Sequence, residues 1–388
     1  MKIAYCGPIS LSIVAPELLT EDRINDGYSY PFGAHFVNLL LELGHEVVVV
    51  TSAMCVDEVY EYREGKLSVY ICPRRHPRKF VADAYSSERR YMIEALKSAK
   101  PDIVHAQWSY EFCHAARCSE LPYVVTLRDA PWQVFWHTRS IYRLYRSLYA
   151  YWALWGVKNA TAVSPYILES FSKYFFLKGA EVVPNALKGV ALASQFDCQP
   201  NSVSPTILSV SAWNALKNCK MTFSSFYLIR KRYRAASLKL VGPGLEANGA
   251  AHQWAKKNKL DAGVQFAGKL AHGEVLRCMR NDADVLLYPS LEESFCMVVL
   301  EAMASGLPAV VLPRAGALPW LVDDGRAGAI AKDRSPSALA EAAISLLKDE
   351  CYYNSIRENA LQRVKKHFTM KSVVESYLNV YGKVLGNA

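Results

Sequence analysis

The sequence predicts an α/β protein built on two parallel β-sheets, and its length and one repeated pattern support this. The chain has 388 residues, which is long for a single hydrophobic core and suggests two domains of ordinary size. Short apolar runs rich in Val and Ile alternate with segments of helical period, as expected for βαβ units. A polar, irregular stretch at 186–205 interrupts this alternation, and we interpret it as the linker.

The first half contains six strand-like runs separated by helix-like segments. The clearest helix is AHFVNLLLEL (34–43), which Gly44 is expected to end as a left-handed cap. A second helix-like run, 138–158, mixes Arg with Tyr, Trp and Leu, whereas the basic stretch 73–79 is interpreted as a loop. The predicted strands are 2–7, 46–52, 102–107, 123–128, 160–164 and 181–185.

The alternation restarts after the linker, and a last helix near 370–384 is expected to pack back on the first domain. We therefore divide the chain into a first domain at 1–195, a second at 205–368 and a C-terminal helix at 369–388. The predicted strands are 206–211, 238–242, 264–268, 284–289, 308–313 and 328–331. The predicted helices are 220–233, 246–258, 272–280, 296–304, 336–348 and 352–366.

Composition restricts the possible partners and the compartment. The net charge of +9 favours anionic partners, but it does not distinguish phosphates from an acidic membrane surface. We expect no nucleic-acid partner, because the basic residues are not gathered in a recognisable module. The ten Cys form no CxxC pair and no zinc spacing, which favours a reducing cytoplasm without disulfides. We also expect neither a signal peptide nor a membrane-spanning run.

The segment DVLLYPSLEESFCMVVLEAMASGLPAVVLP (284–313) carries the most chemical information. A buried strand is followed by a short loop with Glu293, and then by a helix that contains Glu301. The two glutamates are eight residues apart, so we expect them two helical turns apart on one face. The first amides of the helix, at Phe295, Cys296 and Met297, should face a cleft at the carboxyl ends of the strands, where free amides bind phosphate.

This segment resembles the motif of two glutamates separated by seven residues in glycosyltransferase family four. That family is retaining and has the GT-B fold, which consists of two facing Rossmann-like domains with a cleft between them. The usual form is close to PSxxEGFGxxxLEAMAxGxPV, and here it is PSLEESFCMVVLEAMASGLPAV. The resemblance extends over nearly the whole chain. Further matching segments are VGPG (241–244), VQFAGKL (264–270), GALPWLVDDGRAG (316–328), FGAHFVNLLLELGHEVVVVT (32–51), DIVHAQ (102–107), TAVSPYI (161–167) and VVPNAL (182–187).

The resemblance implies roles for individual residues of this chain. Glu293 matches the glutamate that contacts the donor hexose, and Glu301 matches the one that binds the nucleotide ribose. Lys217 matches the lysine that offsets the charge of the donor diphosphate, which is the leaving group. The donor-binding positions implied by the matched segments are Gly33, Gly242 and Leu270, together with the amides of Phe295, Cys296 and Met297.

Several positions depart from the family pattern. Ala212 stands where the family usually has an arginine that accompanies the lysine, and Glu293-Ser294-Phe295-Cys296 lacks the usual glycines. Trp320 replaces a glutamate, and Arg128, followed by Asp129, occupies the place of a histidine in the first domain. We therefore consider Arg128 a candidate for the missing cation, and we count Arg128 and Asp129 among the catalytic candidates.

The resemblance implies a metal-independent, retaining transferase that moves a hexose from a UDP- or GDP-sugar to an acceptor hydroxyl, with no cofactor. Asp282-Ala283-Asp284 has the spacing of a carboxylate pair, but we interpret it as structural and predict no metal. His105 follows an apolar strand, and a lone histidine at such a position is more often a core residue than a catalyst. Two alternatives stay open, a non-catalytic nucleotide-sugar-binding protein and a nucleotide-sugar epimerase of the same fold.

The expected acceptor is a glycan or a lipid-linked glycan of the cell envelope, reached from the cytoplasmic face of the membrane. Related enzymes commonly extend such glycans, and the first domain should be the acceptor side. The basic stretch 73–79 and the Arg/aromatic run from Arg139 to Lys158 both lie in that domain. The run from Arg139 to Lys158 is equally compatible with an aromatic-rich core helix. The functional interpretation is peripheral association with an anionic membrane surface.

Overall fold

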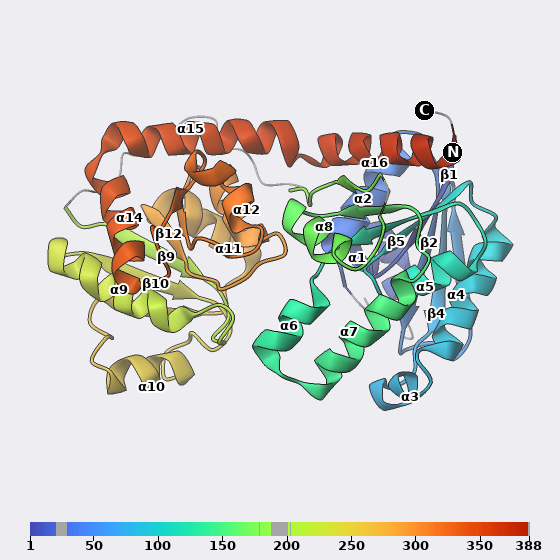
Figure 1. The fold of residues 1–388 in the computed structure, drawn as a ribbon, viewed down its shortest axis with the longest axis horizontal. Helices are drawn as coiled ribbons and strands as arrows, with labels where there is room; N and C mark the ends of the chain where they lie inside the picture. Colours follow the sequence, from blue (N-terminus) through green and yellow to red (C-terminus); the bar gives the residue numbers. More distant parts are fainter. Residues whose placement is uncertain (21–28, 178, 188–200, 202, 387–388) are drawn as a thin grey trace. The chain divides into compact units, whose positions relative to one another are not determined.

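The computed structural model describes residues 1–20, 29–177, 179–187, 201 and 203–386. The chain forms two compact units, which Figure 1 shows: unit 1 contains Met1–Lys188 and Thr369–Ala388, and unit 2 contains Gly189–Phe368. Each unit is built on one largely parallel sheet, which confirms the predicted fold class. Most of the predicted linker, 186–205, lies outside the described residues.

The sheet of unit 1 has eight strands. In chain order they are β1 (Lys2–Cys6), β2 (Glu46–Ala53), β3 (Tyr60–Glu64), β4 (Leu67–Pro73), β5 (Ile103–Gln107), β6 (Tyr123–Leu127), β7 (Ala160–Ala162) and β8 (Glu181–Val182). Their spatial order is β3-β4-β2-β1-β5-β6-β7-β8, and β3 is antiparallel to its neighbour. The central strands are almost entirely buried, as expected for parallel strands that helices cover.

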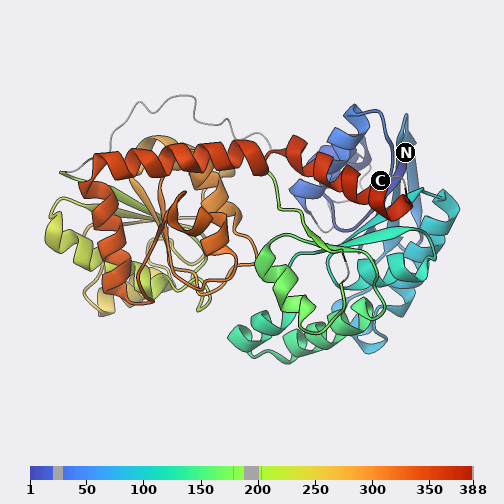
Figure 2. The same ribbon diagram turned by 45° about the horizontal axis from the view of Figure 1, so that its top comes forward.

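The helices of unit 1 include the C-terminal helix of the chain. In chain order they are α1 (Leu11–Val14), η1 (Pro16–Thr20), α2 (Pro31–Glu42), α3 (Pro77–Ala82), α4 (Ser86–Ala99), α5 (Glu111–Cys118), α6 (Pro131–Thr138), α7 (Ile141–Leu154), α8 (Pro165–Ser172) and α16 (Met370–Leu385). Helix α16 packs against α2, as Figures 1 and 2 both show. Tyr377 and Phe36 join the same apolar core there, with ring centroids 5.3 Å apart. The C-terminal helix therefore returns to the first domain, as predicted.

Three local predictions in unit 1 were wrong or incomplete. The antiparallel hairpin of β3 and β4 was missed, although the apolar run of β4 carried a strand signal. The stretch 73–79 is not all loop, because α3 begins inside it at Pro77, where the fixed φ of proline suits a first helical turn. The helical run 138–158 forms α7, but the preceding helix α6 was not predicted.

Unit 2 follows the predicted order of strands and helices closely. Its strands are β9 (Thr206–Val210), β10 (Ser237–Val241), β11 (Val264–Gly268), β12 (Val285–Tyr288), β13 (Ala309–Val311) and β14 (Ala329–Ile330). Its helices are α9 (Cys219–Arg232), α10 (Ala250–Lys257), α11 (His272–Arg277), η2 (Cys278–Asp282), α12 (Met297–Ala304), α13 (Leu318–Leu321), η3 (Asp323–Gly325), α14 (Pro336–Lys348) and α15 (Glu350–His367). The strand order is β11-β10-β9-β12-β13-β14, all parallel. None of the described helices is both long and apolar enough to cross a bilayer.

Candidate active site

The sheet of unit 2 has one place where the strand order reverses. From β9 the chain adds β10 and β11 on one side, and it then returns to add β12, β13 and β14 on the other. Ligands of open α/β sheets bind beyond the carboxyl ends of the strands at such a switch point. Lys217 lies in the loop after β9, and Glu293 lies in the loop after β12. Lys217 and Glu293, to which the family resemblance gave roles, therefore flank the switch point.

Backbone hydrogen bonds join the two loops that carry these residues. The amide of Leu291 donates to the carbonyl of Leu216 at 2.9 Å, and the Ser290 hydroxyl donates to the same carbonyl at 3.3 Å. The amide of Lys217 donates to the Asn214 side chain at 2.9 Å. These contacts position the lysine directly beside the loop of Glu293.

Lys217, Glu293 and Tyr288 form a compact polar cluster. The Lys217 ammonium lies 2.5 Å from Glu293 Oε1 and 3.2 Å from the Tyr288 hydroxyl. The Tyr288 hydroxyl donates to the same carboxylate oxygen at 2.9 Å, and burial raises the pKa of Tyr288. The side chains of Lys217 and Glu293 are 24% and 12% exposed, so water screens their attraction only partly. Sequence reasoning missed Tyr288, whose only signal was its place at the end of β12.

Cys296 occupies a strained position next to this cluster. Its φ of +89° lies in the left-handed region that glycine adopts freely, and the family pattern has a glycine here. Burial, followed by the charge of Glu293, raises the pKa of the Cys296 thiol to about 12, so the thiol stays protonated at neutral pH. Helix α12 begins only at Met297, which corrects the prediction that the amides of Phe295 and Cys296 belong to its first turn.

The side chain of Phe295 belongs to an aromatic cluster of unit 2. Its ring lies 6.1 Å from the ring of Trp320 and 5.8 Å from that of Phe368, both edge-on. The Arg363 guanidinium lies 5.6 Å from the centroid of each of these two rings. Trp320, which replaces a glutamate of the family pattern, therefore packs against Phe295, two residues after Glu293.

Glu301 lies inside α12, with His272 at the start of α11 as its partner. The imidazole Nε2 and the carboxylate Oε1 are 3.0 Å apart, and the Glu301 side chain is 13% exposed. Burial raises the pKa of Glu301, although the hydrogen bond to His272 opposes the shift. Because Glu293 precedes α12, the two glutamates do not share a helix face, and that prediction was wrong. His272 was also missed, since it stands alone in the sequence.

The glycine loop after β10 has a steric role. Gly242 has φ +137°, and a Cβ there would lie 1.8 Å from the carbonyl oxygen of Ser211, so only glycine fits. Leu270 lies two residues after β11, at the same carboxyl edge, and it is partly exposed. A cavity of about 510 Å³ also adjoins the Lys217 loop. It is lined by Trp213, Asn214, Ala215, Asn218, Cys219, Lys220, Ala250 and Trp254.

In unit 1, Arg128 is held at the carboxyl end of β6. Its Nε donates to the Gln107 side chain at 2.6 Å, and a second guanidinium nitrogen donates to Asn185. The guanidinium carbon lies 4.7 Å from the ring centroid of Phe32, and the residue is only 6% exposed. Gly33 is also needed for packing, because a Cβ there would lie 2.1 Å from the Tyr5 hydroxyl. The role of Arg128 toward a diphosphate stays a prediction.

Asp129 and Arg146 belong to a second buried polar cluster in unit 1. The Tyr110 hydroxyl donates to Asp129 at 2.6 Å, and burial raises the pKa of Asp129 against this bond and the nearby Arg146. Arg146 donates to Glu111 at 3.1 Å and to Tyr85 at 2.9 Å, and its guanidinium lies 3.4 Å from the Tyr110 ring centroid. Arg146 therefore stabilises the interior, so for this residue the membrane-facing interpretation was wrong and the core-helix alternative holds.

The remaining candidates have structural partners. His105 is buried, with the Thr126 hydroxyl 2.7 Å from one ring nitrogen and the Tyr381 hydroxyl 2.6 Å from the other. The Asp284 carboxylate accepts hydrogen bonds from the backbone amide of Asn201 and from that of Thr206, the first residue of β9. No group of three potential metal ligands occurs among the described residues, and the cysteines among them are unpaired.

Comparison with known proteins places these residues in a family context. Residues 194–363 match the family model described as glycosyl transferases group 1, and residues 34–188 match that of glycosyltransferase family 4. The first matching region contains Lys217, Glu293 and Glu301. The second contains Arg128 and Asp129.

Two curated relatives and one solved structure illustrate the similarity. The chain is 34% identical over 150 residues to N-acetyl-alpha-D-glucosaminyl L-malate synthase of Bacillus anthracis, a region that covers 39% of this chain and 38% of that enzyme. It is 25% identical over 353 residues, 89% of this chain and 76% of the relative, to a phosphatidylinositol N-acetylglucosaminyltransferase subunit of Arabidopsis thaliana. The crystal structure of Anabaena HepE in complex with UDP-glucose superposes with a TM-score of 0.69 at 16% identity, covering 99% of this chain and 100% of HepE. At that identity the superposition shows a shared fold.

Proposed function

The chain belongs to glycosyltransferase family 4, the group 1 glycosyl transferases with the GT-B fold, and on this premise we propose that it transfers a hexose from a UDP- or GDP-sugar to an acceptor hydroxyl. The observation that carries the proposal is the cluster of Lys217, Glu293 and Tyr288 at the switch point of unit 2. A cation and a carboxylate at this place suit a ligand with both a diphosphate and a sugar.

The donor site is proposed as follows. Lys217 exchanges its contact with Glu293 for the diphosphate, and this exchange frees the carboxylate for the hydroxyls of the hexose. Glu301 accepts hydrogen bonds from the ribose diol, with His272 fixing its orientation. HepE, which shares the fold, was solved with UDP-glucose, and this supports a nucleotide-sugar donor. GDP remains an equal candidate for the nucleotide.

The proposed reaction retains the anomeric configuration and needs no metal ion. The bond from the anomeric carbon to the diphosphate oxygen breaks, and a bond to the acceptor oxygen forms on the same face of the sugar. The departing phosphate takes the proton of the acceptor hydroxyl. Lys217 stabilises the negative charge that develops on the diphosphate as its bond to the sugar breaks.

Changing the two glutamates separately tests this assignment. We expect Glu301→Gln to weaken nucleotide binding, because the ribose loses its carboxylate acceptor, and Glu293→Gln to lower turnover, because sugar orientation matters most in the transition state. Binding is measured by the rise in melting temperature with UDP, GDP and their sugars, and turnover by release of the nucleoside diphosphate. Wild-type behaviour of both variants would contradict the site.

The same screen includes a pH series. The pKa of Glu301 is raised above its ordinary value, so this carboxylate becomes protonated at a higher pH than an ordinary glutamate as the pH falls. We expect nucleotide affinity to fall with it, because a protonated carboxyl accepts less well from the ribose. Glu301→Gln should remove this part of the pH dependence.

The two alternatives give different products. A non-catalytic nucleotide-sugar-binding protein, suggested by Ala212 and the glycine-free loop at Glu293, would bind the donor without releasing nucleoside diphosphate. An epimerase of the same fold would convert the donor sugar in the absence of any acceptor. Analysis of donor and products with and without acceptor separates all three.

The proposal extends to the acceptor, a lipid-linked glycan handled at the cytoplasmic membrane face. One relative, which matches most of this chain, belongs by name to a phosphatidylinositol N-acetylglucosaminyltransferase.

Four exposed apolar residues of α7 and its end share the spacing i, i+7, i+11 and i+14, which places them on one helix face. They are Ile141, Leu148, Trp152 and Trp155, and we call them the α7 stripe.

The α7 stripe and its neighbouring cations can be tested together. We expect the protein to sediment with anionic vesicles at low salt, since each basic residue near such a surface contributes roughly 1 kcal/mol. Arg139→Glu with Arg143→Glu should weaken this binding, and so should Leu148→Glu alone. Changing Lys256 and Lys257 of unit 2 to Glu is the matched control. If the wild-type protein stays in the supernatant, the proposed peripheral association is wrong and a soluble acceptor becomes the better hypothesis.

A further inference from the structure

Two side chains of different character hold the carboxylate of Glu293. The Lys217 ammonium lies 2.5 Å from Oε1, and the Tyr288 hydroxyl donates to the same oxygen at 2.9 Å. In the proposed donor complex Lys217 leaves this oxygen for the diphosphate. Tyr288 then stays as the hydrogen-bond partner that Glu293 keeps.

Tyr288 has a more fixed place than Lys217. It is the last residue of β12, where it pairs with Val311 of β13, and it is only 3% exposed. Lys217 comes from a loop, its side chain is 24% exposed, and the four-carbon stem of a lysine is flexible. Tyr288 can therefore hold a carboxylate in one orientation while Lys217 moves.

The hydrogen bonds of the Tyr288 hydroxyl fix the direction of its proton. Burial raises the pKa of Tyr288 well above its ordinary value, so the hydroxyl keeps its proton at neutral pH. Its oxygen accepts from the Lys217 ammonium at 3.2 Å, and a side-chain hydrogen bond also links it to Cys296. An ammonium can only donate, whereas a carboxylate can only accept. The one proton of the hydroxyl therefore belongs to the bond with Glu293.

The main chain of Glu293 is anchored separately from its side chain. The amide of Ala317 donates to the Glu293 carbonyl at 2.8 Å, and Glu293 forms a parallel β-bridge with Gly316. A Cβ on Gly316 would lie 2.2 Å from that carbonyl oxygen, so the two backbones are in close contact. The carboxylate is the part that needs a further support. Lys217 and Tyr288 both contact Oε1, so a hexose hydroxyl would use Oε2.

We infer that Tyr288 is a positioning residue of the donor site, which holds Oε1 of Glu293 once Lys217 has turned to the diphosphate. Oε2 then meets a hydroxyl of the hexose in the orientation that bond breaking requires. This role rests on the function proposed above. Since Tyr288 is buried, it acts through Glu293 and does not itself touch the sugar.

Tyr288→Phe removes the hydroxyl and keeps the ring, so it tests the hydrogen bond rather than the packing. Turnover is measured as release of nucleoside diphosphate from UDP-glucose or GDP-glucose with water as the acceptor, and affinity by calorimetry. We expect kcat to fall about tenfold, since a hydrogen bond to a charged group is lost. Affinity for free UDP or GDP should stay within about twofold, because Lys217 and Glu301 are proposed to bind the nucleotide.

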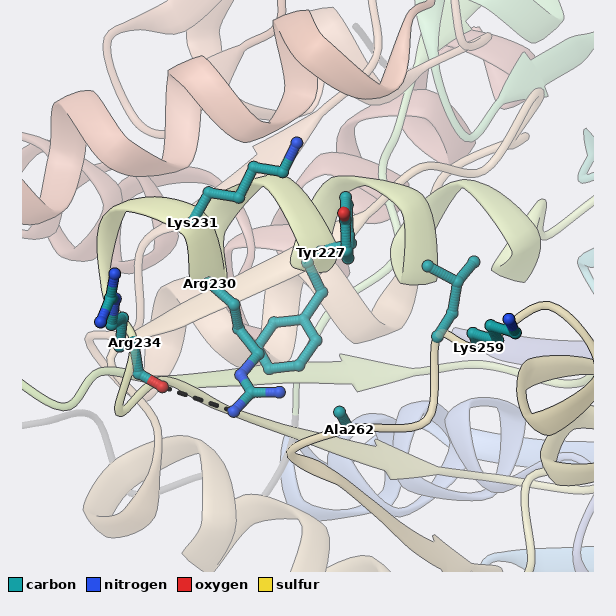
Figure 3. A pocket seen from close by; sticks show the side chains of 8 residues that line it. Tyr227, Arg230, Lys231, Arg234, Lys259 and Ala262 are labelled. Atoms are coloured by element: carbon teal, nitrogen blue, oxygen red, sulfur yellow. Dashed lines mark hydrogen bonds between the residues drawn. The ribbon is translucent and has the colours of Figure 1, made fainter.

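Two other tyrosines of unit 2 provide matched controls. Tyr353 is 4% exposed, and its hydroxyl donates at 2.8 Å to the carbonyl of Asp284, just before the other end of β12. Tyr353→Phe therefore removes a buried hydrogen bond away from Glu293. Tyr227 is 48% exposed and lines a pocket between the last turns of α9 and the turn before β11, which Figure 3 shows. Both Tyr353→Phe and Tyr227→Phe should leave kcat unchanged.

A double variant decides whether Tyr288 acts through Glu293. In the Glu293→Ala background, Tyr288→Phe should lower kcat by no more than about twofold further, since the carboxylate that the hydroxyl holds is gone. An undiminished loss in that background overturns the inference. A loss of less than about threefold in Tyr288→Phe alone also overturns it, and so does an equal loss in Tyr353→Phe.

Binding separates this inference from the proposed transferase activity. If the wild-type protein binds the donor without releasing nucleoside diphosphate, the transferase proposal fails. Tyr288 is then judged by the affinity for the nucleotide sugar relative to that for the free nucleotide, which Tyr288→Phe should lower at least about threefold. An unchanged ratio overturns the positioning role, and a wild-type protein that binds neither compound overturns both.

Discussion

Replacing Lys217 by alanine should lower the rate of glycosyl transfer by at least about tenfold, which corresponds to about 1.4 kcal/mol of transition-state stabilisation. Lys217 lies 2.5 Å from Glu293, so the variant leaves a partly buried carboxylate without its counter-charge. That carboxylate would then repel the diphosphate that the lysine is proposed to hold. The loss should appear in kcat, because the charge on the leaving group develops during bond breaking.

Two further variants make this result specific. Lys348 is an exposed lysine at the end of α14, and Lys348→Ala is the matched control. We expect it to leave the rate of glycosyl transfer unchanged. Combining Lys217→Ala with Glu293→Gln removes both charges and completes a double-mutant cycle. A cycle without coupling, or a wild-type rate in Lys217→Ala, would show that the diphosphate is held elsewhere.

Reversing the charge of Arg146 should destabilise unit 1 by several kcal/mol. Arg146 is 14% exposed and Glu111 is 4% exposed, so Arg146→Glu would place two carboxylates together in the interior. Breaking a buried pair by removing one partner costs roughly 3–5 kcal/mol, and the reversal adds repulsion. Arg146→Glu should therefore lower the first transition in thermal unfolding, or prevent folding altogether.

The neighbouring Arg143 provides the control for this prediction. It is exposed on the same helix, and Arg143→Glu should change stability by no more than about 0.5 kcal/mol. Equal melting temperatures for the two variants would contradict the buried role of Arg146. The comparison also has a practical consequence, since loss of vesicle binding in an Arg146 variant would reflect unfolding rather than a surface effect.

Much of the fold could be predicted because local patterns agreed with the tertiary structure. The strands of unit 2 are short, apolar and bounded by turn residues, so their order and bounds were recognisable to within a residue or two. The hairpin of β3 and β4 was missed because Tyr60–Glu64 is a polar edge strand, without the apolar run of a buried strand. Helix α3 was missed because its proline and basic residues were interpreted as loop signals.

The candidate site, too, could be predicted from the sequence only in part. The motif singled out Glu293 and Glu301, and the family resemblance added Lys217, but neither revealed the partners of these residues. Tyr288 and His272 contact these residues through hydrogen bonds between separate elements, and such pairs leave no periodic signal in a chain. Helical spacing also misplaced Glu293 relative to Glu301, because the left-handed backbone of Cys296 delays the start of α12 until Met297.

The sequence by itself determined the two-sheet α/β architecture, the family and the positions of the motif residues, because hydrophobic periodicity and short motifs are local properties of the chain. Only the tertiary structure decided that Lys217 and Glu293 form an ion pair and that Arg146 is an interior residue. The Lys217–Glu293 contact joins residues 76 positions apart, and the Arg146–Glu111 contact joins residues 35 positions apart. The packing of the sheets and helices brings such distant residues together, and no local pattern records which of them will meet.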